Sequence, residues 1–472
     1  MTKTTHTFKQ VADREKGLKQ TLSSSQLSMI AIGGAIGTGL FLGSSFAIGF
    51  AGPSVLVSYG IGALIALLLM GCLAEMTVRH PTSGSFGSFA EFYVAPWFGF
   101  ALRYAYWASI VFAVGTEITA AAMYMKFWYP EVPGGYWMVG FSLALILANA
   151  LSVKVFGSIE YLFSLLKLCA IVAFILLGAW VVYDAPMDSG IGLANYSNDR
   201  GFFPNGVWGT WVAVIVAFFS YLSIEMIAVA AGEAKDPERA VTRAFRITVV
   251  RLVVFYLLTI ALVLAIVPWA RNTGGESPFV MVMAASGIPY ASGVINAVIL
   301  VAALSAMNSQ LYITTRLMFS LSRAGQAPAM LGRLSRNGVP LAALLLSSLG
   351  IALATLLYLA YAEQAFTLMM SIAMFGAMFT WAGIFLTHLF FRRQQGSEPL
   401  AFKLWGYPWT SLGGLVLMLA VMVTTLFTEQ FFLTLVCGLP FLGLILSIYY
   451  LRFRGKRALD AEAPKPLPLR QP

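Results

Sequence analysis

Long apolar stretches alternate with short polar segments along most of this 472-residue chain. A polar segment at residues 1–26 comes first, and twelve mostly apolar stretches follow it. A membrane-crossing helix needs roughly 20 such residues, so the pattern predicts an all-α polytopic membrane protein with 12 transmembrane helices. The predicted spans cover residues 27–50, 53–76, 97–128, 137–153, 161–183, 207–231, 245–269, 291–321, 341–361, 366–391, 409–427 and 431–453.

The composition agrees with a membrane protein and excludes a soluble enzyme. Hydrophobic residues make up 59% of the chain and charged residues 11%, whereas soluble proteins have about half apolar and about a quarter charged residues. The first apolar stretch is too long for the core of a cleavable signal peptide, so we expect it to remain as a span. The three cysteines and three histidines are scattered, which predicts no disulfide framework, no metal site and no cofactor.

The net charge of +10 indicates orientation in a membrane rather than a nucleic-acid partner. An even number of spans places both ends of the chain on one side. The predicted outer loops then hold only Lys126, Arg200 and Arg271 of the thirty basic residues. Since basic loops stay in the cytoplasm, we expect a cytoplasmic (inner) membrane protein with cytoplasmic tails at residues 1–26 and 454–472.

The first predicted span contains the segment GGAIGTG at residues 33–39. Glycine is a poor helix former, and unwound backbone is tolerated inside a membrane only where it lines a cavity or is buried in protein. A glycine-rich phosphate loop is a weak alternative, because it requires a preceding strand in a soluble domain. Close helix packing through small residues is a further explanation that stays open.

A second interruption is predicted in the sixth span, where residues 218–226 contain Ser220, Ser223 and the ionisable Glu225 among apolar neighbours. Spans one and six are corresponding members of two five-span halves, and paired interrupted helices are the best sequence indication of a transporter's central site. Free N–H groups at such a break can bind a carboxylate, and free carbonyls can bind an ammonium. These two groups are complementary to an α-amino acid.

Four motifs, in this order, resemble those of the amino acid permease branch of the amino acid, polyamine and organocation (APC) transporter superfamily. They occupy residues 28–44, 80–100, 230–237 and 305–328. The resemblance covers nearly the whole spanning region and implies a LeuT-like five-plus-five inverted repeat plus two further helices. The implied parts are a first repeat at 27–183, a second at 207–391, and spans 11 and 12 at 409–453.

The resemblance also implies where the first span would bind its substrate. The family's carboxylate-binding turn corresponds to Thr38 and Gly39. The carbonyl group of Ala35 corresponds to one that faces the substrate ammonium. The resemblance therefore implies that backbone groups at this break hold the substrate.

In the sixth span, Phe219 takes the place of the family's aromatic gate. The carbonyls of Phe219, Ser220 and Leu222 correspond to the remaining ammonium ligands. Ser223 departs from the family pattern, since many relatives have glycine two residues before the acid that matches Glu225. A hydroxyl at this position would narrow the pocket or bind the substrate.

Ionisable residues inside a membrane are costly and therefore suggest function. In the superfamily, a lysine at the position of Lys167 replaces a bound sodium ion; here it would carry the coupled proton, or else extend to the cytoplasmic surface. Glu225 would couple or gate transport, or serve as a buried structural acid. Glu117 would reach the central cavity or form a helix-packing hydrogen bond, and Glu75 would be structural or part of an inner gate.

These features predict a secondary active transporter that imports an amino acid with a proton, and not an enzyme. An amino acid exchanger and a transporter-like nutrient sensor remain alternatives. No GxxxxGK[ST] motif is present, which argues against direct use of ATP. The expected partners are an amino acid, a proton and the lipid bilayer. A mostly apolar pocket of Ala113, Ser223, Phe375 and Trp381 favours neutral amino acids. Glu117 or Glu225 would equally pair with a basic side chain or with the amine of an ω-amino acid, so that alternative stays open.

Overall fold

The protein is described by a computed structural model. Wherever the chain is described, its regular elements are all helical, which confirms the predicted all-α class. Ten of the described helices are long and apolar enough to cross a membrane. The described part of the seventh predicted span is a shorter apolar helix, Val253–Ile266, so the count of twelve stays a prediction. The described residues are 8, 11, 34, 36–82, 84–151, 153–186, 189–230, 253–272, 276–395, 400 and 402–462.

The first two predicted spans form one helical run with a sharp turn. The run begins as a π-helix, η1 (Gly39–Gly43), and continues as α3 (Ser44–Ala51). A short 3₁₀ turn, η2 (Gly52–Ser54), leads into α4 (Val55–Arg79). Gly52 has a φ of +62°, a left-handed conformation that favours glycine.

The remaining helices of the first half follow the predicted spans closely. Pro96 opens the third span, because proline suits the first turn of a helix. A short helix rich in serine and phenylalanine precedes that span. The elements are α5 (Ser85–Tyr93), α6 (Pro96–Met125), α7 (Gly134–Leu151), α8 (Val153–Asp184) and η3 (Leu193–Tyr196).

The second half contains a broken helix at the sixth span and two helices at the ninth. Spans 11 and 12 follow as α17 and α18. The elements are α9 (Gly206–Tyr221), α10 (Met226–Ala230), η5 (Trp269–Arg271), α12 (Pro278–Ala285), α13 (Ala291–Arg323), η6 (Ala329–Gly332), α14 (Leu341–Ser347), α15 (Leu349–Ala360), α16 (Ala365–Gln395), α17 (Trp409–Thr424), η7 (Thr425–Phe427), η8 (Glu429–Phe431) and α18 (Leu433–Glu462).

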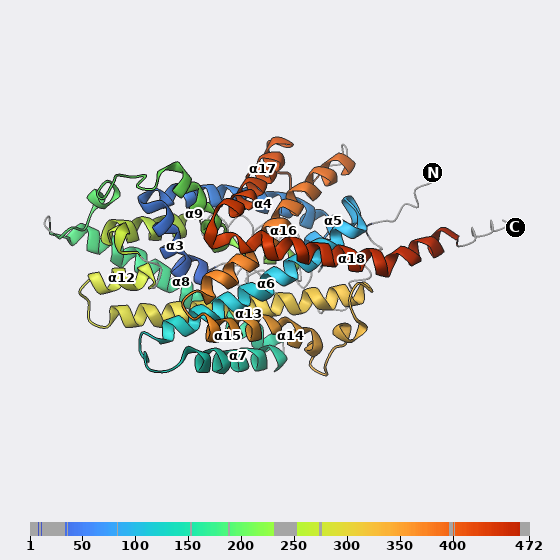
Figure 1. Cartoon of the computed structure of the whole chain (residues 1–472), viewed down its shortest axis with the longest axis horizontal. Helices are drawn as coiled ribbons and strands as arrows, with labels where there is room; N and C mark the ends of the chain where they lie inside the picture. The colour runs from blue at the N-terminus through green and yellow to red at the C-terminus, as the bar shows by residue number, and fades with distance from the viewer. Residues whose placement is uncertain are drawn as a thin grey trace.

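The core lies around the third, sixth and tenth spans. The most apolar part of the sixth span is entirely buried, whereas only 22% of that part of the fifth span is buried inside the protein. The outer helices expose large apolar side chains, as expected for surfaces that face lipid. Figure 1 shows α5 and the C-terminal part of α18 at one end of the molecule, and α3 and α12 at the other.

Candidate functional site between two broken helices

The helix of the sixth span is interrupted, as predicted. α9 ends at Tyr221 and α10 begins at Met226. Leu222 has extended backbone, with φ −60° and ψ 150°. Ser223 has a φ of +80°, which is unusual for any residue with a side chain. The position where many relatives have glycine therefore has a backbone conformation that glycine would adopt without strain.

The first span changes its helical geometry next to this interruption. Ile36 and Gly37 form a bend, and the π-helix η1 begins at Gly39. π-Helical turns are rare and frequently occur at functional sites. Ala35, whose carbonyl was predicted to face the substrate, lies outside the described residues.

The glycines of the first span allow the two breaks to touch. A Cβ atom added at Gly39 would lie 2.8 Å from the Cα of Ser220. One added at Gly37 would lie 2.5 Å from Oε1 of Glu117, and one at Gly34 would lie 3.4 Å from the Cβ of Ser223. Close packing thus accounts for these glycines, and the same packing brings the candidate binding groups together.

Glu117, on α6, reaches the first break. Its side chain is buried, and its Oε2 accepts a hydrogen bond from the backbone N–H of Thr38 at 3.1 Å. Thr38 belongs to the turn predicted to bind the substrate carboxylate. In this structure the protein's own carboxylate therefore occupies one of the predicted substrate donors.

Glu225 fastens the second break to its neighbours. Its fully buried carboxylate accepts hydrogen bonds from the hydroxyl of Tyr106 at 2.8 Å and from Nε1 of Trp381 at 3.1 Å. The backbone N–H of Ser223 donates a third, at 3.2 Å. Tyr106 was missed by the sequence analysis, because a tyrosine inside an apolar span carries no signal that distinguishes a hydrogen-bond donor from a packing residue.

The predicted ammonium ligands of the sixth span are buried, and some already have partners. The carbonyl of Ser220 accepts a hydrogen bond from the hydroxyl of Tyr256 at 2.9 Å. The Ser220 hydroxyl lies 2.9 Å from that of Tyr59. Phe219 and Leu222 are almost fully buried. The Oγ of Ser223 is buried without a hydrogen-bond partner among the described residues, so it is available to a substrate.

Lys167 contacts the first break directly. Its side chain is fully buried, and its Nζ donates a hydrogen bond to the carbonyl of Ile36 at 3.2 Å. This contact agrees with the position of a sodium substitute and differs from a lysine that extends to the membrane surface. Glu160, on the same helix, is buried as well and accepts a hydrogen bond from the hydroxyl of Ser305 at 2.8 Å. Glu160 was not identified from the sequence, although it lies seven residues before Lys167 on the same helix.

A cavity of about 600 Å³ lies on the side of the predicted outer loops. Leu42 and Phe46 of the first span line it, together with Tyr124 of α6 and the loop acids Glu276 and Glu363. Tyr124 lies two turns after Glu117 on α6, and Leu42 lies one turn after Thr38. The cavity therefore approaches the site from the outer side.

One residue of the predicted side-chain pocket lies elsewhere. Phe375 packs against Gly438 of α18 and stacks on Phe379, with ring centroids 6.0 Å apart. It belongs to the contact between α16 and α18, because the small residue at 438 leaves room for its ring. Trp381, by contrast, lies at the site through its bond to Glu225.

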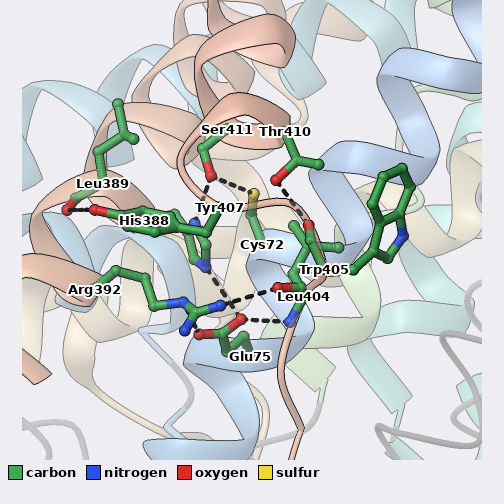
Figure 2. A network of polar contacts seen from close by, with 10 residues as sticks. All are labelled: Cys72, Glu75, His388, Leu389, Arg392, Leu404, Trp405, Tyr407, Thr410 and Ser411. Carbon is green, nitrogen blue, oxygen red and sulfur yellow. Dashed lines mark hydrogen bonds and ion pairs between the residues drawn. The ribbon is translucent and has the colours of Figure 1, made fainter. Parts of the chain in front are cut away.

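Glu75 belongs to a separate polar network, which Figure 2 shows. Its Oε1 lies 2.6 Å from Nε of Arg392, and its Oε2 lies 3.4 Å from Nε2 of His388. The backbone N–H of Leu404 donates to Oε2 at 2.7 Å, and the Oγ of Ser411 lies 2.8 Å from Nδ1 of His388. We call Glu75, His388, Arg392, Leu404 and Ser411 the Glu75 network. It joins α4, α16, α17 and the segment before α17.

A third polar group holds α5 against the helices around it. Nη2 of Arg103 lies 3.4 Å from Oε2 of Glu91 and donates to the hydroxyl of Ser88 at 2.7 Å. Nη1 of Arg103 donates to Oε1 of Gln326, which follows α13. These contacts join α5 to α6 and to the segment that follows α13.

Comparison with known proteins identifies relatives along nearly the full chain. The family model described as "Amino acid permease" matches residues 26–462. The uncharacterized amino acid permease YtnA of Bacillus subtilis is 34% identical, over 95% of this chain and 98% of YtnA. The aromatic amino acid transport protein AroP of Salmonella typhimurium is 36% identical, over 92% and 95%. The amino-acid permease RocE of B. subtilis is 36% identical, over 95% and 98%.

A solved structure shares the fold. It is the substrate-bound outward-open state of a Na⁺-coupled sialic acid symporter, which matches with a TM-score of 0.57 over 89% of this chain and 94% of that chain. The two sequences are 11% identical, so the likeness concerns the fold alone. It confirms the predicted LeuT-like fold class.

Proposed function

Because the chain belongs to the amino acid permease family, we propose that it imports an amino acid together with a proton across the cytoplasmic (inner) membrane. It is a multi-pass membrane protein and a transporter rather than an enzyme. The proposed orientation, with both tails cytoplasmic, follows from the few basic residues in the predicted outer loops.

The contact between Lys167 and the carbonyl of Ile36 carries the proposal of proton coupling. It places a buried cation at the break where the substrate is expected. An ionisable residue at this depth is costly unless it has a role. Since the amine can hold or release a proton in place, no separate sodium ion is needed there.

Substrate and proton binding would be linked through Thr38. The substrate carboxylate and Glu117 compete for the same backbone N–H group. When the substrate binds, it displaces the Glu117 carboxylate, which then lacks that donor inside a buried site. A buried carboxylate without its hydrogen bond favours the protonated form. Substrate binding on the outer side would therefore promote proton uptake.

We expect the substrate to be a neutral amino acid. The unpartnered hydroxyl of Ser223 and the indole of Trp381 border a largely apolar site. AroP is named for aromatic amino acid transport, and we extend that class to this chain as the first to test. Competition by the twenty amino acids against one radiolabelled substrate would identify the preferred side chain.

The function is tested with purified protein in liposomes. A radiolabelled mixture of the twenty amino acids serves as the probe, with and without an imposed inward proton gradient. We expect the gradient to drive accumulation without sodium, and Lys167→Ala to abolish accumulation while amino acid exchange persists. Uptake that ignores the gradient but requires internal amino acid would establish an exchanger instead, and a sodium requirement would overturn the role of Lys167.

A further inference from the structure

A buried carboxylate near the cytoplasmic end of α8 has more partners than packing requires. Glu160 is fully buried. Its Oε1 accepts hydrogen bonds from the hydroxyl of Ser305 at 2.8 Å and of Ser164 at 3.2 Å. Its Oε2 accepts one from Nδ2 of Asn308 at 3.1 Å, and Nδ2 of Asn149 donates to Oδ1 of Asn308 at 2.8 Å. α8 and α13 thus supply the three donors to Glu160, and α7 holds one of them, Asn308, in place.

Every one of these donors is neutral. A carboxylate that accepts only neutral hydrogen bonds keeps its full negative charge, which then acts on the nearest cation through the low-dielectric interior. Lys167, two turns further along the same helix, is a buried cation of this kind. The donors therefore hold a fixed negative charge beside the proposed coupling residue.

The spacing along α8 places the two groups on one face. Glu160, Ser164 and Lys167 follow each other at intervals of four and three residues, which keeps side chains on the same side of a helix. Seven residues rise about 10.5 Å along the axis. Helical side chains lean toward the N-terminus, so the long lysine side chain shortens this separation.

Among the described residues, the acidic groups that face Lys167 come from two helices. α6 contributes Glu117, and α8 itself contributes Glu160. On α13, the neutral Ser305 and Asn308 contact Glu160. At the first break, the neutral carbonyl of Ile36 contacts Lys167 itself. Two carboxylates from different helices therefore act on one amine.

We propose that Glu160 is a positioning residue for proton coupling: its fixed charge, held by donors of α8 and α13, keeps Lys167 in its protonated form until the transport cycle removes the proton. This inference rests on the proposed function, because it assigns Glu160 an effect only through Lys167. It predicts that Glu160 sets the pH range of driven transport without contacting the substrate.

The test measures the pH dependence of uptake in liposomes. The radiolabelled amino acid mixture is driven by an imposed membrane potential, with equal pH on both sides, varied from about pH 5 to 9. Glu160→Gln keeps the size of the side chain and one of its two acceptor oxygens but removes its charge. At an effective dielectric constant of about 20, a unit charge about 10 Å away shifts a protonation equilibrium by about one pH unit. We expect the midpoint of driven uptake to move toward acid by that amount.

Ser305→Ala is the matched control, because it removes one hydrogen bond to Glu160 and leaves the charge. Its midpoint should stay within about 0.3 pH unit of the wild type. Glu160→Asp, which retains the charge, should do the same. If Glu160→Gln does not fold, Glu160→Gln/Ser164→Asp returns a carboxylate one turn closer to Lys167, and its midpoint should equal or exceed that of the wild type.

Amino acid exchange without a driving potential reports binding and folding in each variant, and it should remain within about twofold of the wild type in Glu160→Gln. An unshifted midpoint in Glu160→Gln, or an equal loss of uptake at every pH in Glu160→Gln and Ser305→Ala, would overturn the inference.

Lys167→Ala separates the two proposals. Loss of driven uptake in that variant, together with an unshifted midpoint in Glu160→Gln, would refute only the role of Glu160. Driven uptake that survives in Lys167→Ala would refute the coupling role that the proposed function gives to Lys167.

Discussion

The Glu75 network and the two helix breaks both bury carboxylates, but they stabilise them differently. Glu75 has a guanidinium group 2.6 Å away and an imidazole 3.4 Å away. Glu225 is held by a phenol, an indole and a backbone N–H, and Glu117 accepts the N–H of Thr38. The first arrangement pairs opposite charges directly, whereas the second uses neutral donors.

This difference indicates which carboxylates can change during transport. Breaking a buried ion pair leaves an uncompensated charge and is strongly unfavourable. A carboxylate held by neutral donors can exchange one donor, or take up a proton, at a smaller cost. We therefore regard the Glu75 network as a fixed joint between α4, α16 and α17, and the breaks as the parts that rearrange.

The largest effect is expected from removing the cation of the fixed joint. Arg392→Ala leaves the buried Glu75 without its guanidinium partner, which should lower the free energy of unfolding by about 3–5 kcal/mol. Thermal unfolding in detergent micelles measures this loss. Arg393→Ala is the control, because Arg393 is adjacent but exposed. Equal losses in both variants would show that the ion pair is not what holds the joint.

Adding a methyl group between the two helix breaks should reduce transport. Gly39→Ala places a Cβ atom 2.8 Å from the Cα of Ser220, a backbone atom that no side-chain rotation can relieve. Overpacking of this kind costs about 1–3 kcal/mol, and we expect substrate uptake to fall by about tenfold or more. Gly60→Ala is the control, because nothing lies within 4 Å of the added atom at that position. Normal uptake by Gly39→Ala would contradict the close contact of the breaks.

Neutralising the acid of the second break should have a smaller effect on stability. In Glu225→Gln the side-chain carbonyl can still accept from Tyr106 or Trp381, so the expected loss is about 1 kcal/mol. Glu75→Gln, measured in the same way, should lose several times more, because Arg392 then lacks its counter-charge. Equal losses would remove the distinction between the two regions.

The smallest effect concerns His80, which follows α4 outside the span. Burial, and then the charge of Arg79, lower the pKa of His80 from 6.5 to about 4. Between these values the unfolded chain binds more protons than the folded one, so stability falls as the pH drops from about 6.5 to 4 and changes little below. The residue is partly exposed, which limits this contribution to about 1 kcal/mol. The wild type should therefore lose more thermal stability than His80→Gln between pH 7 and 5; parallel curves would exclude His80 as the cause.

The span positions and the two breaks were predictable because they depend on local properties. Apolar runs locate the long helices, most of them within a few residues, although α8 begins at Val153 instead of 161 and α18 ends at Glu462 instead of 453. Clustered glycines locate the bend before η1. Partner identity was not predictable. His388 and Arg392 lie more than 300 residues from Glu75, and no periodicity relates them. Phe375 was assigned to the wrong surface, since a helix fully buried in a bundle shows no polar face that would orient it.

The sequence by itself determined that this protein is helical, crosses a membrane, and carries glycines and ionisable residues where an apolar span has no need of them. The length of an apolar run and the helix propensity of its residues are local properties, so they can be recognised from the sequence alone. Only the tertiary structure decided that Glu117 accepts the N–H of Thr38, that Lys167 donates to the carbonyl of Ile36, and that Glu160 accepts hydrogen bonds from Ser164, Ser305 and Asn308. Burial and hydrogen bonding between distant segments arise from packing, and packing alone determines which charges face each other.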